Sequence, residues 1–101
     1  MRYVLKWSHP RVRANYFMGY NYSIDGSLLL HRTVFLAEAA TFDVKDNAYF
    51  FILDKKINDK SLSVYEVLDE EWQIAEKELF KAKLEGTFVS TKSKNLLILG
   101  G

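Results

Sequence analysis

Apolar and polar residues alternate along the first third of the chain with the period of two that is typical of β-strands. In the opening segment, Tyr3, Leu5 and Trp7 fall on one side of an extended chain, and the intervening residues fall on the other. The same alternation returns twice before the pattern changes near residue 35. We therefore expect three strands, over residues 2 to 7, 14 to 23 and 27 to 32.

The second expected strand is rich in tyrosine. Tyr16, Met18, Tyr20 and Tyr22 occupy alternate positions, so they are expected on one face of the sheet. If helices cover that face, the tyrosines are core residues with their hydroxyls at the rim. If the face is open, the same rings form a platform on which bases can stack. The pattern favours the core interpretation and leaves the second one open.

Asp25 and Gly26 separate the second and third expected strands. This dipeptide is a strong hairpin signal, because both central positions of a type I′ turn need a positive φ. We therefore expect an antiparallel hairpin with a tight turn at these two residues.

The middle of the chain changes to helical signals. Residues 35 to 40 favour a short helical turn. Asp43 is an expected N-cap, and Asp46 lies where the positive end of a helix stabilises a carboxylate, so we expect a helix over residues 44 to 54. The continuous apolar run over residues 48 to 53 also fits a buried strand, but the capping residues favour the helix.

The second half of the chain begins with an alternating segment that predicts a strand over residues 62 to 68. A helix is then expected over residues 70 to 85, with Gly86 at the C′ position. Its apolar positions recur with a helical period at Trp72, Ala75, Leu79 and Ala82. Two short strands, over residues 87 to 90 and 95 to 99, complete the expected elements.

These elements predict an α+β fold with the order β-β-β-α-β-α-β-β. Hairpins at both ends with helices between them favour a mostly antiparallel sheet with two helices packed on one face. The chain has 101 residues, of which 49% are hydrophobic, and this suits one packed core. We expect a single globular domain over residues 1 to 101.

The net formal charge of +1 conceals an uneven distribution of charge. Residues 1 to 32 carry one acidic side chain, Asp25, against five basic ones, and the rest of the chain is mildly acidic. An asymmetry of this kind can mark a binding face.

The sequence contains no cysteine, which excludes disulfides, thiolate catalysis and cysteine-ligated zinc. Small secreted domains often depend on disulfides, so the absence of cysteine favours a reducing compartment. No signal-peptide pattern opens the sequence, and its apolar runs are too short for a membrane span. We expect a cytoplasmic protein with no membrane partner.

No residue pattern points to catalysis, a metal or a cofactor. The two histidines, His9 and His31, lack a nucleophile at a suitable spacing. Asp43 and Asp46 do not have the spacing of a calcium loop, and helix capping explains them more simply. The five glycines are scattered and form neither a P-loop nor a dinucleotide fingerprint. We therefore expect a non-enzymatic protein with no metal and no cofactor.

The tyrosine-rich hairpin with its Asp25-Gly26 turn is followed by the segment Leu36-Ala-Glu-Ala-Ala-Thr-Phe42 and then by the expected first helix. In this order of elements, the first half of the chain resembles small uncharacterised proteins of phages and prophages of Gram-positive bacteria. Those proteins carry a tyrosine-rich hairpin followed by a Leu-x-Glu-Ala-x-x-Phe element and a short helix. The resemblance implies a phage or prophage context and a partner-binding role, with residues 36 to 42 linking the sheet to the helix. It supplies no catalytic residue.

We expect a non-enzymatic protein-binding module, an accessory protein that binds a host or defence protein or forms a homo-oligomer. Tyrosine and arginine often anchor such interfaces. The alternative is a nucleic-acid-binding accessory protein, in which basic side chains neutralise phosphates and tyrosines stack on bases. For either partner, the candidate binding residues are Lys6, Arg11, Arg13, Tyr20, Tyr22 and Arg32.

Overall fold

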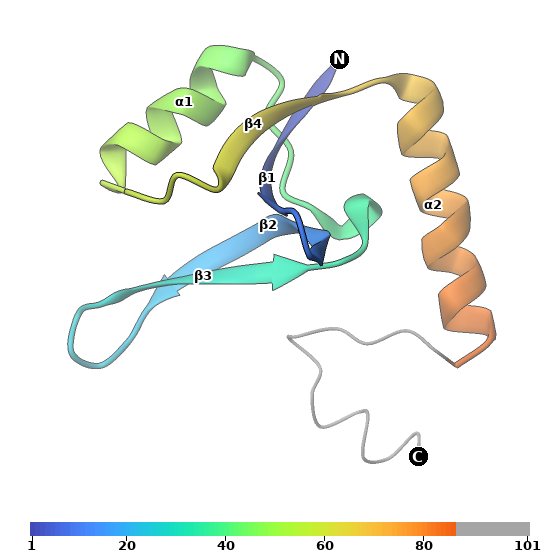
Figure 1. The fold of residues 1–101 in the computed structure, drawn as a ribbon, viewed down its shortest axis with the longest axis horizontal. Helices are drawn as coiled ribbons and strands as arrows, with labels where there is room; N and C mark the ends of the chain where they lie inside the picture. Colours follow the sequence, from blue (N-terminus) through green and yellow to red (C-terminus); the bar gives the residue numbers. More distant parts are fainter. Residues whose placement is uncertain (87–101) are drawn as a thin grey trace.

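The computed structural model describes residues 1–86, which form a four-stranded antiparallel sheet and two α-helices (Figure 1). This confirms the α+β fold and the order of the elements as far as the second helix. The strands expected over residues 87 to 90 and 95 to 99 lie outside the described residues. The elements are β1 (Arg2–His9), β2 (Val12–Tyr22), β3 (Leu28–Thr33), the 3₁₀-helix η1 (Leu36–Glu38), α1 (Lys45–Asp54), β4 (Leu62–Val67) and α2 (Asp69–Leu84).

The strands lie side by side in the order β3-β2-β1-β4, and every neighbouring pair is antiparallel. β1 is central, because β2 follows it as a hairpin on one side and β4 returns to pair with it on the other. The register between β1 and β4 runs without a break from Arg2 opposite Val67 to Trp7 opposite Leu62. The edge strands of the described sheet are therefore β3 and β4.

β1 is apolar on both of its faces, and this decides where the helices lie. Val4 and Leu5 are neighbours in an extended strand, so they point to opposite faces, and neither has any exposed surface. Leu5 packs with Ala48 of α1, whereas Val4 packs with Val67 and Trp72 on the side of α2. The helices cover opposite faces, so the expectation that both pack on one face is wrong. We call these faces the α1 face and the α2 face.

The segment between β3 and α1 carries the chain from one face to the other. Ala39, directly after η1, packs on the α2 face, whereas Ala40 and Phe42 pack on the α1 face. Backbone hydrogen bonds hold this crossing beside the sheet. The Ala40 amide donates to the carbonyl of Phe17 at 2.9 Å, and Phe42 forms an antiparallel bridge with Tyr3.

A β-bulge in β2 separates the tyrosines that the sequence pattern placed on one face. Tyr16 lies opposite Lys6 on the α2 face. Between Phe17 and Gly19, β2 contains one residue more than β3, so the alternation shifts by one position. Tyr20 therefore lies on the α1 face, opposite Leu30, and Tyr22 follows it there. The expectation that Tyr16, Met18, Tyr20 and Tyr22 share one face is wrong for this reason.

The hairpin between β2 and β3 is present, but its turn is wider than expected. The amide of Ser23 donates to the carbonyl of Ser27, and the amide of Gly26 donates to the carbonyl of Ser23, each at 2.9 Å. Gly26 has a φ of 87°, which suits glycine, but Asp25 does not have a positive φ. Instead, the Asp25 carboxylate accepts hydrogen bonds from the Ser23 hydroxyl and the Ser27 amide. The prediction of a two-residue type I′ turn is therefore wrong: the loop closes between Ser23 and Ser27, and Asp25 stabilises it through its side chain without adopting a positive φ.

Residues 48–53 are helical, which excludes the alternative of a buried strand there. Asp46 lies in the first turn of α1, as expected. The N-cap is Val44, without a side-chain hydrogen bond, so the expected capping role of Asp43 is wrong. α1 therefore depends on packing more than on a cap: Ala48 is completely buried, and Phe51 and Ile52 pack against the sheet.

α2 follows the expected pattern closely. Ala75 and Ala82 are buried, and three carboxylates occupy its first turn while Lys81 and Lys83 lie in its last turn. Gly86 comes directly after the C-cap and has a φ of 71°, as expected for a C′ glycine.

Candidate partner-binding site

The six residues expected to bind a partner lie at separate places on the sheet. Lys6 is on the α2 face, where its ammonium lies 4.4 Å from the centre of the Tyr65 ring. Arg11 is exposed in the connection between β1 and β2, and Arg13 is exposed near the start of β2. The other three, Tyr20, Tyr22 and Arg32, belong to the α1 face. The structure therefore does not bring all six into one surface.

Tyr20 and Tyr22 form the most organised part of this set. They are 43% and 55% exposed, so the core interpretation does not hold for them. Their rings meet edge to face with centroids 6.0 Å apart, and the Phe51 ring lies 5.5 Å from Tyr20 on the core side. Lys55, directly after α1, places its Nζ 4.6 Å from the centre of the Tyr20 ring and donates a 3.2 Å hydrogen bond to the Tyr22 hydroxyl. We call Tyr20, Tyr22 and Lys55 the tyrosine–lysine cluster.

The cluster keeps a positive charge beside two exposed aromatic rings. The hydrogen bond to the Tyr22 hydroxyl raises the pKa of Lys55 above its ordinary value, and the Tyr20 side chain adds to this effect. The ammonium is therefore fully protonated at neutral pH. Together the cluster offers a cation, phenolic hydroxyls and apolar ring surface, which suit carboxylates, carbonyl groups and flat apolar groups of a partner.

The sequence did not reveal Lys55 as part of this site. Lys55 and Tyr22 are far apart in the chain, and only the packing of α1 on the sheet brings them together. No spacing rule relates the end of a helix to a strand in this way. The one useful signal was Gly19 in β2, because a glycine inside a strand often marks a bulge.

Arg32 is on the α1 face, over a different aromatic ring. Its guanidinium carbon lies 4.0 Å from the centre of the Trp7 ring. The Trp7 indole nitrogen donates a 3.0 Å hydrogen bond to the Asp59 carboxylate. The pKa of Asp59 is lowered, chiefly by hydrogen bonds from Ser61, so the carboxylate is charged and attracts Arg32. These contacts border a shallow hollow of about 240 Å³ that is also lined by His9.

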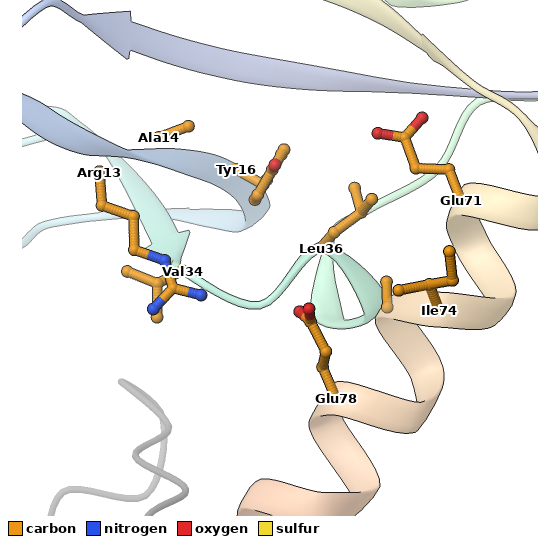
Figure 2. Close-up of a pocket in the computed structure, with 9 residues that line it drawn as sticks. Arg13, Ala14, Tyr16, Val34, Leu36, Glu71, Ile74 and Glu78 are labelled. Atoms are coloured by element: carbon orange, nitrogen blue, oxygen red, sulfur yellow. The ribbon is translucent and has the colours of Figure 1, made fainter.

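A second hollow, of about 220 Å³, lies on the α2 face between β2, η1 and α2. Figure 2 shows Arg13 reaching toward it from β2, while Glu71 and Glu78 extend from α2. Burial and the nearby Glu71 carboxylate raise the pKa of Tyr16, which also lines this hollow, whereas Arg13 opposes that change. Charges of both signs therefore face the same small space.

The rim of this hollow is held by a short hydrogen bond. The Tyr65 hydroxyl donates to the Glu71 carboxylate at 2.6 Å. This bond raises the pKa of Tyr65 to about 12, because ionising the hydroxyl would remove the donated proton beside a carboxylate. This hydrogen bond connects the first turns of α2 to β4, so Glu71 has a structural role in holding α2 against the sheet.

Within residues 1–86, no group of three or more histidine, cysteine or acidic side chains is arranged to hold a metal ion. Neither helix of this part of the chain is long and apolar enough to cross a membrane.

Comparison with protein-family models, with curated proteins and with solved structures returned no match for this chain.

Proposed function

We propose that this protein is a non-enzymatic binding module whose tyrosine–lysine cluster contacts a protein partner. The supporting observation is that Tyr20 and Tyr22 are exposed and yet held in place by Phe51 and Lys55. Aromatic side chains that are already ordered lose little conformational entropy on binding. Tyrosine is also among the residues that most often dominate the energy of an interface.

The chemistry of the cluster favours a partner surface that is rich in acceptors. The Lys55 ammonium is charged, and both phenolic hydroxyls can donate to a carboxylate or a backbone carbonyl. The resemblance to phage and prophage proteins adds a class of partner, namely a bacterial host or defence protein in the cytoplasm. An acidic patch on such a protein is the complement that we propose.

Arg11 and Arg13 do not belong to this proposed interface. Arg13 and Tyr22 are nine positions apart in β2, which corresponds to about 30 Å along an extended strand. That distance is comparable to the full width of a standard interface of about 800 Å² per partner. The two arginines therefore provide a control located on the same strand.

The proposal is tested by presenting the immobilised domain to a lysate of a Gram-positive bacterium after nuclease treatment and identifying what is retained. We expect a discrete protein that Tyr20→Ala/Tyr22→Ala loses and that Arg11→Ala/Arg13→Ala retains. With the purified partner, the tyrosine pair should account for a loss of affinity of about 30-fold or more. Equal retention by all variants would rule out the cluster as the interface.

A second candidate function is binding of single-stranded nucleic acid. It is favoured by one observation, the exposed Tyr20 and Tyr22 rings beside the Lys55 ammonium on an open part of the sheet. Against it, Lys6 lies on the opposite face of the sheet, so the basic N-terminal residues do not form one continuous positive surface for a phosphate backbone. Fluorescence anisotropy with single-stranded oligonucleotides at increasing salt separates the two functions. Affinity that falls steeply with salt supports nucleic acid, and no binding at low salt removes it.

A further inference from the structure

α1 is apolar on the side that faces away from the sheet as well as on the side that packs against it. Ala48, Phe51 and Ile52 face the core. On the opposite side, three large apolar side chains are exposed: Tyr49 at 47%, Phe50 at 67% and Leu53 at 75%. We call these three residues the outer face of α1. A helix that is apolar all round is ordinarily buried on all sides, so the outer face indicates a missing partner.

The ends of this face carry opposite charges. Asp46 precedes the apolar residues by one helical turn, and Lys56 follows the C-cap residue Lys55 at the other end. Asp46, Tyr49 and Leu53 are separated by intervals of three and four residues within α1, which places them along one side of the helix, and Lys56 lies beyond its C-terminal end with a φ of 55°. Lys45 at the start of the helix and Lys55 after it add two positive charges, and Asp54 adds a negative one whose carboxylate lies 3.9 Å from the Lys55 ammonium.

We propose that the outer face of α1 binds the same face of a second copy of this chain, with the two helices antiparallel. A two-fold interface must be complementary to itself after rotation. An axis near the middle of α1 brings Tyr49 of each copy against Leu53 of the other. It also brings each Asp46 near the end of the other helix that Lys56 follows, and it sets the two helix dipoles antiparallel, which is favourable.

The exposed area agrees with a reversible dimer. The three side chains expose on the order of 400 Å² if each has a full area near 200 Å². With the polar rim that interfaces carry, this corresponds to about 600 Å² per copy and about 1,200 Å² in total, the lower limit of standard interfaces. The dimer should therefore dissociate on dilution through the micromolar range.

Sedimentation velocity over a range of protein concentrations tests the proposal. We expect a monomer–dimer equilibrium for the natural sequence and a monomer at all concentrations for Phe50→Glu. The matched control is Phe80→Glu on α2, because Phe80 is 64% exposed and the substitution is identical. A natural chain that is monomeric up to high micromolar concentration would overturn the proposal, as would equal effects of the two variants. Circular dichroism checks that both variants are folded, and Leu53→Glu provides a second variant with the same expected result.

The charges and the absence of cysteine allow the antiparallel arrangement to be tested directly. Asp46→Lys and Lys56→Asp should each weaken the dimer several-fold, and the double variant should restore it. Tyr49→Cys mixed with Leu53→Cys should form the mixed disulfide faster than either variant forms its own. Preferential cross-linking of identical cysteines would overturn the antiparallel arrangement. The inference does not rest on the proposed function, because the tyrosine–lysine cluster and the outer face of α1 share no residue.

Discussion

On the α1 face of the sheet, Leu5, Trp7 and Phe17 pack against a helix through apolar and aromatic surface. On the α2 face, the contacts with the helix are mixed: the Tyr65 hydroxyl binds Glu71, and the Arg2 guanidinium lies 4.8 Å from the centre of the Trp72 ring. The contacts between α1 and the sheet are made by apolar and aromatic side chains, whereas those of α2 include charged side chains, and the hollow on the α2 face lies directly beside α2. We infer that the α1 face supplies most of the hydrophobic stabilisation and that α2 is attached less firmly.

The largest effect expected from this comparison comes from the two neighbouring residues of β1. Leu5→Ala should lower the free energy of unfolding by about 3 kcal/mol, through lost burial and a cavity on the α1 face. Val4→Ala, on the α2 face, should lower it by about 2 kcal/mol, since two methyl groups are lost from a completely buried side chain. Urea denaturation measures both. A larger effect of Val4→Ala would reverse the ranking of the faces.

Trp7 tests the polar contacts of the otherwise apolar α1 face. Trp7→Phe removes the hydrogen bond to Asp59 and weakens the contact with Arg32, so we expect a loss of about 1 to 2 kcal/mol by thermal or urea denaturation. Asp59→Asn is the comparison, because it keeps an acceptor for the indole. If Asp59→Asn destabilises the fold as much as Trp7→Phe, charge rather than ring packing dominates at this site.

Tyr65→Phe should cost about 1 kcal/mol, because it removes one hydrogen bond to a carboxylate on the α2 face. The pKa of Tyr65 is about 12 in the folded chain, above the ordinary value of 10, so this contribution is complete below pH 10 and is lost as the pH rises toward 12. Denaturation at several alkaline pH values should therefore show a decline that is smaller in Tyr65→Phe. Equal declines in both proteins would mean that other groups cause it.

The smallest effect is expected at the hairpin loop, which packs on neither face. Hydrogen bonds from the Ser23 and Ser27 side chains and from the Ser27 backbone lower the pKa of Asp25 from 3.8 to about 2. The stability that its carboxylate adds is therefore present above pH 4 and lost as the pH falls toward 2. We expect Asp25→Asn to be less sensitive to acid over this range, and carboxyl chemical shifts measured during an acid titration to give the pKa directly.

Most of the fold could be read from local patterns, because those patterns report burial. The alternation around Leu5 identified β1, and the spacing of Ala75 and Ala82 identified the buried side of α2. The placement of the helices could not be read in the same way. Val4 shares its side of β1 with Arg2 and Lys6, yet those two side chains place their cationic ends over aromatic rings, and Val4 is completely buried.

The candidate site was predictable in part. Tyr20 and Tyr22 were identified by residue type, but their face depended on a bulge that no local periodicity announces. Lys55 entered the site through tertiary packing alone. The outer face of α1 was visible in the sequence as a continuous apolar run, but its exposure depended on how many sides of the helix the sheet could cover.

The bulge in β2 adds one residue to the strand between Phe17 and Gly19, just before Tyr20 and Tyr22. Removing one codon within the bulge would pair the two strands residue for residue and keep Tyr20 opposite Leu30, so both tyrosines would stay on the α1 face beside Lys55. In this chain the bulge can therefore absorb the loss of one residue from the strand without moving the tyrosine–lysine cluster to the other face.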